Sequence, residues 1–264
     1  MPIITFASLS PTDGGTGKDT FAVNTATWLA KAHNQSVVVV DLNPYGNMQE
    51  QFGETDNMPA GELMGHIFLD TTLTSETIKQ IIPKFRSLGF WMLPTNYDGF
   101  DYADEGAFLR LKASLTQTFD VVIFNLANAM RKIEIDAIRQ SNLVFLVGTD
   151  DHINLEKYEN GLNAYKDIVN GDIKILINRG FGEHESVTTG LKSLGYEVFA
   201  YAIDDEEVFV TNREGKAIVL TNPNLSFSRV VRKVGEESLK CVNKHTATNK
   251  NSHSILSVMN GYFL

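Results

Sequence analysis

A glycine-rich segment carries the clearest chemistry in this sequence, Asp13-Gly-Gly-Thr-Gly-Lys-Asp-Thr20. It follows a short apolar run, Ile3 to Ala7, and precedes a run, Phe21 to Ala30, whose spacing suits an amphipathic helix. Glycines in such a turn let several backbone N–H groups and a helix N-terminus point at one anion, and Lys18 adds a positive charge. Strand, glycine turn and helix in this order predict a phosphate-binding loop, with an ordinary tight turn as the alternative.

A second polar loop ends the next apolar run. Ser36 to Asp41 is rich in valine, as is typical of a strand buried on both faces, and it leads into Asp41-Leu-Asn-Pro-Tyr-Gly-Asn47. Residues 54–86 indicate two helical stretches, with Pro59 and Pro83 as breakers. Further strands are predicted at Phe90 to Pro94, Phe119 to Asn125, Leu143 to Val147, Ile173 to Ile177 and Val198 to Ile203.

Strands that alternate with helices predict parallel pairing and right-handed crossovers. The expected fold is therefore α/β, a doubly wound and mostly parallel sheet with helices on both faces. Ligands collect beyond the carboxyl ends of such strands. The glycine loop, Asn43, Asn125 and Asn178 are expected to converge there.

Composition limits the classes of protein. The chain has 264 residues, 43% hydrophobic and 21% charged, which suits a globular domain with a substantial core. A net charge of −9 argues against a surface that binds nucleic acid throughout. Cys241 is the only cysteine, so a cysteine-only metal cluster is excluded and a reducing cytoplasm is expected. No apolar run approaches the roughly twenty residues of a bilayer span, so any membrane contact is expected to be peripheral.

The two loops together resemble those of the ParA/MinD family of dimerising P-loop ATPases, whose patterns are roughly K-G-G-x-G-K-T-T and D-x-D-P-x-G-N. The resemblance runs from Met1 to about Leu239 and implies ATP or ADP as ligand, with Mg²⁺. It implies nucleotide contacts in the glycine loop and in the strand end Ile175-Leu-Ile-Asn-Arg179. Ala202 to Asp205 and Val208 to Gly215 resemble the segment that closes over the base. The residues expected to contact the nucleotide are Gly14, Gly15, Thr16, Gly17, Lys18, Asp19, Thr20, Asn178, Arg179 and Asp204. For Asn178, capping of the strand end is the plain alternative.

The departures from the family pattern fall on positions that serve catalysis. Asp13 stands where the family keeps a signature lysine that reaches the partner's phosphates, and Asp19 replaces a magnesium-ligating hydroxyl. Asn43 replaces the aspartate that orients water, and Asn125 replaces a carboxylate near magnesium. Phosphoryl transfer depends on positioning and charge stabilisation, so no catalytic residue is assigned and hydrolysis is expected to be lost or very weak.

Asp19 is the candidate metal ligand, since a carboxylate there replaces the charge missing at Asn125. The alternative is that Asp19 only stabilises the N-terminus of the following helix. In its atypical loop the chain is similar in kind to TadZ-like and CpaE-like positioning proteins. The expected role is a homodimeric positioning or partitioning factor that binds partner proteins. A scaffold that binds no nucleotide and an active ATPase with rearranged magnesium ligands stay open.

Three parts are expected along the chain: a P-loop domain over 1–243, a polar linker over 244–254 and an amphipathic tail over 255–264. The segment from Ser226 onward contains six lysines and arginines but only two glutamates, and is therefore basic. This basic helix either contacts DNA without sequence preference, which is not the favoured reading, or is a solvated face. The tail suits peripheral contact at the inner face of the cell membrane, docking on a partner or on the chain's own body, or disorder.

Overall fold

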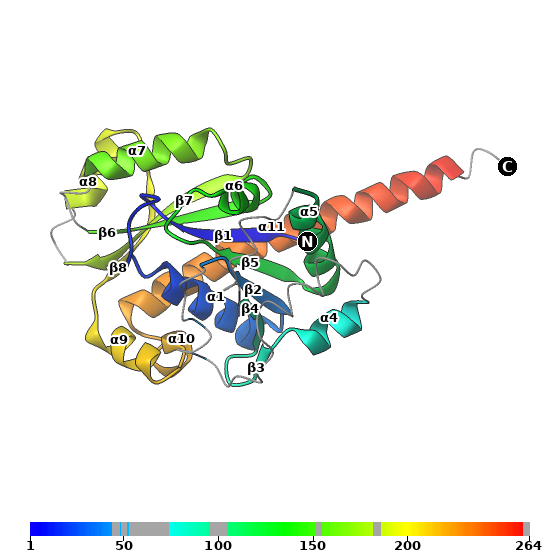
Figure 1. The fold of residues 1–264 in the computed structure, drawn as a ribbon, viewed down its shortest axis with the longest axis horizontal. Coiled ribbons are helices and arrows are strands. Elements are labelled where there is room, and N and C mark those ends of the chain that lie inside the picture. Colours follow the sequence, from blue (N-terminus) through cyan, green and yellow to red (C-terminus); the bar gives the residue numbers. More distant parts are fainter. Residues whose placement is uncertain are drawn as a thin grey trace.

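The computed structural model describes residues 1–43, 48, 52, 74–94, 105–150, 155–181 and 186–260. Within them, eight strands form one sheet in the order β3-β4-β2-β5-β1-β6-β7-β8 (Figure 1). The strands are β1 Ile3–Ser8, β2 Val37–Asp41, β3 Lys84–Phe85, β4 Phe90–Pro94, β5 Val121–Asn125, β6 Leu143–Thr149, β7 Asp172–Gly180 and β8 Val198–Ile203. Every pairing is parallel except that of β3 with β4, which confirms the predicted fold class.

Helices cover both faces of this sheet (Figure 1). One face carries α4 Ser75–Ile81, α5 Glu105–Thr118, α6 Lys132–Arg139, α7 Leu155–Lys166 and α8 Ser186–Ser193. The other carries α1 Lys18–His33, α10 Ile218–Thr221 and the first part of α11 Ser226–Asn260. A further helix, α9 Glu206–Arg213, follows β8. Alternate residues of the central strands enter the two apolar cores, so both faces of the sheet are buried.

The central strand β1 sets the position of the site. It pairs with β5 on one side and β6 on the other, and the chain leaves it for α1 on one face. After β5 the chain crosses the opposite face through α6 to reach β6. The connections after β1 and β5 thus run over opposite faces of the sheet. Their divergence leaves a crevice beyond the carboxyl end of β1, where the glycine loop begins.

Two predicted elements differ from the structure. The second helical stretch does not reach Arg86: α4 ends at Ile81, and β3 pairs antiparallel with β4 after Pro83. Proline cannot donate a helical hydrogen bond, and Gly89 N donates to Phe85 O at 2.6 Å in the turn that returns the chain to β4. Residues 53–73 and 95–104 lie outside the described residues.

The predicted C-terminal end of the last helix also differs from the structure. Helix α11 does not end near Asn243 but continues to Asn260, and its last part projects beyond the body of the molecule (Figure 1). The segment 244–254 contains neither proline nor glycine, so its polar composition does not stop a helix. None of the described helices combines the length and apolarity that crossing a membrane would need.

Candidate functional site

The glycine loop joins β1 to α1 in a shape that only glycine adopts readily. Gly15 has φ 71° and Gly17, the N-cap of α1, has φ 86°, both in the left-handed region. A Cβ on Gly17 would also lie 2.2 Å from Asn178 Nδ2. The loop therefore curls tightly around the N-terminus of α1, as an anion cradle requires.

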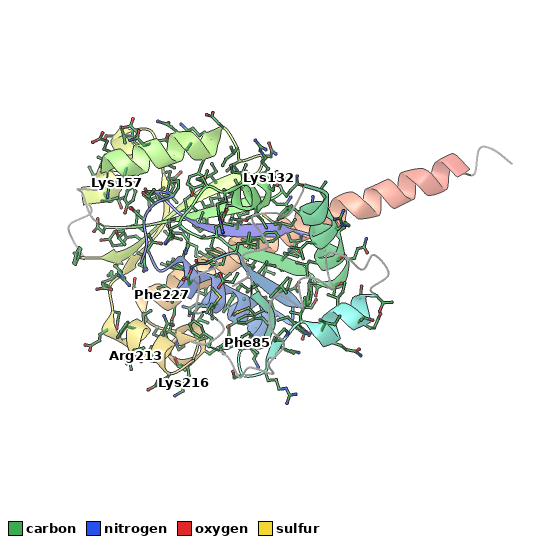
Figure 2. All side chains as sticks on the ribbon, in the orientation of Figure 1. Phe85, Lys132, Lys157, Arg213, Lys216 and Phe227 are labelled. Carbon is green, nitrogen blue, oxygen red and sulfur yellow. The ribbon has the colours of Figure 1, made fainter. Side chains whose placement is uncertain are left out.

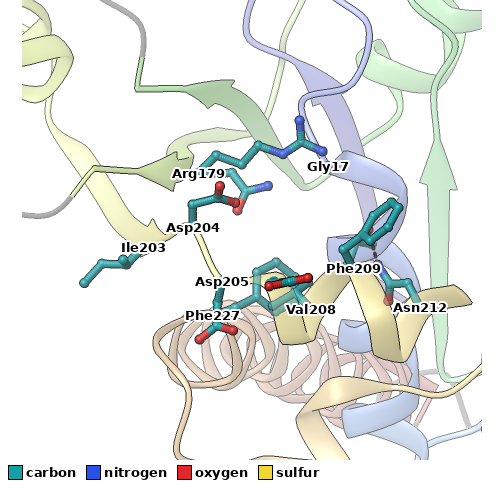
Figure 3. Close-up of a pocket in the computed structure, with 12 residues that line it drawn as sticks. Gly17, Arg179, Ile203, Asp204, Asp205, Val208, Phe209, Asn212 and Phe227 are labelled. Atoms are coloured by element: carbon teal, nitrogen blue, oxygen red, sulfur yellow. Dashed lines mark hydrogen bonds between the residues drawn. The ribbon is translucent and has the colours of Figure 1, made fainter. Parts of the chain in front are cut away.

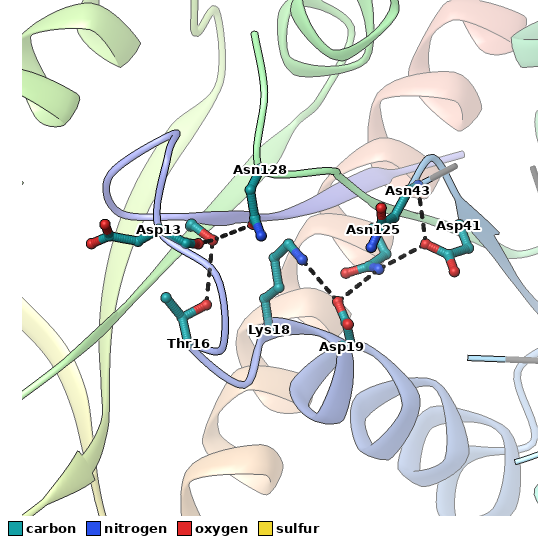
Figure 4. Close-up of polar contacts among 9 residues, drawn as sticks. Asp13, Thr16, Lys18, Asp19, Asp41, Asn43, Asn125 and Asn128 are labelled. Atoms are coloured by element: carbon teal, nitrogen blue, oxygen red, sulfur yellow. Dashed lines mark hydrogen bonds and ion pairs between the residues drawn. The ribbon is translucent and has the colours of Figure 1, made fainter. Parts of the chain in front are cut away.

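Polar side chains at the ends of the neighbouring strands hold this loop in place (Figure 4). Ser8 Oγ lies 2.8 Å from Asp13 O, 3.0 Å from Asn128 Oδ1 and 3.3 Å from Thr16 Oγ1. Asn178 Nδ2, from the end of β7, donates to Thr16 O at 2.9 Å. The loop is thus held by side chains from the ends of two strands, β1 and β7.

Lys18 is buried at 5% exposure, and its ammonium is already engaged. Its Nζ donates to Asp19 Oδ1 at 2.9 Å, while the Asp19 side chain remains 42% exposed (Figure 4). A lysine at the mouth of an anion cradle is the group that a phosphate would seek. In this structure the neighbouring carboxylate occupies that position.

A side-chain amide connects this pair to a second carboxylate. Asn125 Nδ2 donates to Asp19 Oδ1 and to Asp41 Oδ1, each at 3.0 Å, and Asn43 N donates to the same Asp41 oxygen at 3.2 Å (Figure 4). Asn125 is fully buried, and within the described part of the chain its Oδ1 accepts no hydrogen bond. Such an orphaned acceptor calls for an explanation, and a bound ion is one.

Asp41 lies at the end of β2 and is 4% exposed. Burial and the nearby Asp19 carboxylate raise the pKa of Asp41 from 3.8 to about 6, against the opposing effect of its hydrogen bonds from Asn125 and Asn43. The carboxylate is therefore mostly ionised at neutral pH, at a cost to stability.

The donor set fits Mg²⁺, which prefers oxygen ligands and keeps several waters. Asp19 would supply a carboxylate and Asn125 its orphaned Oδ1. Among the described residues no group of three or more His, Cys, Asp or Glu side chains could hold a metal ion alone. Most of the coordination shell would then come from water and phosphate oxygens.

Beside the loop lies a cavity of about 490 Å³ (Figure 3). Arg179 and Asp204 lie on one wall, and Val208 and Phe209 of α9 lie on the other. Arg179 has φ 54°, which is uncommon for a residue with a side chain. The remaining lining residues are Gly17, Thr20, Asn178, Ile203, Asp205, Glu206, Asn212 and Phe227.

The structure brings most of the predicted site residues together. Gly17, Thr20, Asn178, Arg179 and Asp204 line the cavity, next to the pair formed by Lys18 and Asp19. Their role as nucleotide ligands stays a prediction. The residues 44–47 of the second loop lie outside the described part of the chain.

Asp13 is placed apart from this cluster. Figure 4 shows its carboxylate on the far side of the loop from Lys18, and its Oδ1 lies 3.9 Å from Lys157 Nζ on α7. The Lys157 side chain is 58% exposed, so this ion pair contributes little to stability. Asp13 therefore does not face the position where Lys18 would hold a phosphate.

Sequence reasoning did not identify every feature of this site. The buried acid Asp41 was read only as part of a loop motif, although its place at the end of a valine strand signals burial. Asn212 lies in the segment 208–215 expected to close over the base, but its hydrogen bond to Thr20, 192 residues away, has no local signal in the sequence. Val208 and Phe209 belong to the segment 208–215 that the resemblance assigns to closure over the base, whereas Phe227, at the start of α11, carried no such signal.

Comparison with known proteins gives one family and one fold. A family model described as an AAA domain matches residues 3–174. Comparison with curated proteins finds no match. A ParA family ATPase from Chlorobium tepidum superposes with a TM-score of 0.74 at 16% identity, over 89% of this chain and 98% of the other.

Two MinD structures are also similar. MinD with Mg-ADP from Pyrococcus horikoshii has a TM-score of 0.70 at 18% identity, covering 90% of this chain and 95% of its own. MinD in complex with MinC from Aquifex aeolicus has a TM-score of 0.69 at 16% identity, covering 91% and 96%. At such identities the likeness establishes the fold.

The burial of Asp41 predicts a pH-dependent stability effect. Its folded pKa of about 6 exceeds the unfolded value of 3.8, so stability is fully present below pH 4 and is lost as pH rises through 6. The full loss corresponds to about 3 kcal/mol. Asp41→Asn keeps an oxygen for Asn125 and Asn43, so it should raise the free energy of unfolding at pH 7.5 by about 1–3 kcal/mol.

Urea unfolding of both proteins at pH 7.5 and pH 4 measures this difference. The gain should shrink towards zero at pH 4, where wild-type Asp41 is largely protonated in the folded state. An equal gain at both pH values would show that charge burial is not its cause.

Proposed function

From the premise that the chain belongs to the AAA domain family of ParA and MinD ATPases, we propose a positioning or partitioning factor that binds ATP or ADP with Mg²⁺. It works as a homodimer, binds partner proteins, and hydrolyses ATP very weakly or not at all. One observation carries this proposal: the phosphate-binding lysine is kept and buried, but it is tied to Asp19 within a network that Asn125 completes.

Retention of the binding apparatus supports nucleotide binding. The loop keeps its left-handed glycines, and Lys18 stands at the N-terminus of a sixteen-residue helix. The adjoining cavity of about 490 Å³ has the size and mixed lining of a nucleoside site. Mg²⁺, when bound, would neutralise phosphate charge. The chain's own part is to hold phosphates at Lys18 and the loop amides, and to offer Asp19 and Asn125 oxygens.

The residues around the phosphate position support weak hydrolysis. Asn43 and Asn125 present amides where the resemblance expects carboxylates, so neither of these two side chains can orient an attacking water through a negative charge. Asp13, at the position of the signature lysine, faces Lys157. Removal of a single group that stabilises transition-state charge costs roughly 10²–10³ in rate, so these losses together suppress turnover.

The similar structures support a role in assembly. One of them is a MinD bound to MinC, and others are plasmid partition proteins from Borrelia burgdorferi. We place this chain in the cytoplasm, with peripheral membrane contact through 255–264 as one mode of attachment. Contact of the basic α11 with DNA is the less favoured mode, given the net charge of −9.

Steady-state phosphate release tests the loss of hydrolysis. We expect wild-type turnover with Mg-ATP to be no higher than that of Lys18→Ala, because the groups that accelerate phosphoryl transfer are missing. Intact turnover that Lys18→Ala abolishes would mean an active ATPase with rearranged magnesium ligands.

Calorimetric titration with ATP tests binding and the role of Asp19. Without metal, the Asp19 carboxylate competes with phosphate for Lys18, so wild-type binding should be weak and Mg²⁺ should strengthen it. Asp19→Thr should strengthen metal-free ATP binding by about 10- to 100-fold, because a like charge disappears and a hydroxyl donor takes its place.

Asp13→Thr is the matched control, since it removes a carboxylate of the same loop that faces away from Lys18. It should change metal-free binding much less than Asp19→Thr does. If neither the wild type nor Asp19→Thr binds ATP under any metal condition, the chain is a pseudo-ATPase scaffold. Equally tight wild-type binding with a chelator would assign Asp19 to the helix terminus alone.

A further inference from the structure

A basic groove lies at the β8 edge of the sheet, away from the glycine loop. Strand β7 begins at Asp172, but its first partner in β8 is Val198, opposite Ile175. The amino end of β7 therefore extends beyond β8, and a cavity of about 500 Å³ lies there, lined by residues of α7, β7, β8 and α11. A second cavity, of about 450 Å³, adjoins it at residues 195–197 and extends to α8.

Four lysines from four different elements line these two cavities, which we call the lysine groove. They are Lys166 at the end of α7, Lys174 of β7, Lys192 of α8 and Lys233 of α11. The acid among the lining residues is Glu197. Within the described part of the chain, Lys174 is the one lysine of the four that forms an ion pair, with Glu237 at 3.9 Å. The groove is therefore locally positive on a chain whose net charge is −9.

Two aromatic rings hold three of these lysines in position. Lys166 Nζ lies 4.4 Å from the centroid of the Tyr196 ring, and Lys233 Nζ lies 4.5 Å from that of Phe199, whose carbonyl oxygen it also contacts as a donor. Lys174 Nζ lies 5.6 Å from the Phe199 centroid. Such cation–π contacts restrict the long side chains, so less conformational entropy is lost when an anion binds to them.

The shape and lining of the lysine groove select an extended acidic ligand. Positive charges from four elements along two adjoining cavities exceed what one phosphate or carboxylate group can contact. Leu162 and Ile175 add apolar surface, which suits an apolar side chain. Single-stranded nucleic acids bind by stacking bases on aromatic faces, but here lysines lie over the rings of Tyr196 and Phe199. A peptide with several carboxylates and one apolar residue matches both the charge and the apolar surface.

We propose that the lysine groove binds an acidic peptide segment of a partner protein, with its carboxylates on the lysines and an apolar side chain beside Leu162 and Phe199. The inference rests on the proposed binding of partner proteins and states the chemistry of the segment that docks. The groove lies at the amino ends of β7 and β8, whereas the glycine loop lies at the carboxyl ends of the strands. Docking therefore does not require a bound nucleotide.

Fluorescence anisotropy of the full chain without nucleotide tests the proposal. The probe is a fluorescein-labelled peptide of glutamates with one central phenylalanine, and the reference probe has lysines in place of the glutamates. The glutamate peptide should bind at least about 10-fold more tightly than the lysine peptide, because its charge complements the groove. Added salt should weaken this binding, since exposed ion pairs are screened.

A pair of substitutions with a matched control locates the contact. Lys166→Ala combined with Lys233→Ala should weaken binding of the glutamate peptide by about 3- to 20-fold, as expected for the loss of two exposed ion pairs. Lys132→Ala combined with Lys216→Ala changes the net charge equally, and neither residue lines the groove (Figure 2). This control pair should change the affinity by less than about 2-fold.

Amine acetylation of the wild-type chain gives a second measurement that needs no variant. Mass spectrometry should show that the glutamate peptide slows acetylation of Lys166 and Lys233 but leaves Lys132 and Lys216 unchanged. Equal protection of all four lysines, or none, would contradict docking in the groove.

Three further results would overturn the inference. They are equal binding of the two peptides, an equal loss of affinity in the groove pair and the control pair, and tighter binding of a DNA duplex through the same lysines. Self-association in light scattering that the glutamate peptide reverses would instead place a second copy of the chain in the groove. If the chain binds ATP but not the peptide, the inference falls alone, and if it binds the peptide but not ATP, the proposed nucleotide binding falls alone.

Discussion

The carboxylates of Asp19 and Asp41 are held beside one another by a single amide, that of Asn125, which donates to both at 3.0 Å. A carboxylate in place of this amide would bring three negative charges together in a buried site, where like charges cannot all ionise. Asp19 on the helix and Asn125 on the strand therefore depend on each other. A carboxylate at position 125 and a carboxylate at position 19 are therefore alternatives in this geometry rather than independent choices.

In this arrangement the positive charge of Lys18 is compensated by Asp19 before any ligand binds. Lys18 is paired with Asp19, and the Asp41 carboxylate is held by donors from Asn125 and Asn43. A phosphate entering the loop must compete with a carboxylate already in place, unless a cation takes up the freed charge. In an enzyme that turns over rapidly such competition would slow every cycle. Binding of a metal ion together with the phosphate would relieve this competition.

The fold followed from the sequence because its signals are local. Each apolar run ends in a polar loop, and the predicted strands differ from the observed ones by a few residues at each end. The two-residue strand β3 is too short to show a periodic pattern of apolar residues, so the sequence does not predict it. The sequence predicts too early an end for α11, because the polar composition after Asn243 indicates a linker although it is compatible with a helix. The phosphate side of the site followed from a contiguous motif. The contact of Asn212 with Thr20 spans 192 residues, and no local pattern encodes it.

The cavity lies between the glycine loop and helix α9, and the contacts on these two sides differ. On the phosphate side an anion, Asp19, already occupies the lysine, so a ligand gains little there without a cation. On the other side, Asn212 of α9 donates to Thr20 Oγ1 at 2.9 Å. Nucleoside recognition should therefore contribute a larger share of the binding free energy than in a site with a free lysine. Because α9 and the first turn of α1 share the Asn212 amide, that contribution acts directly on the loop that would hold the phosphates.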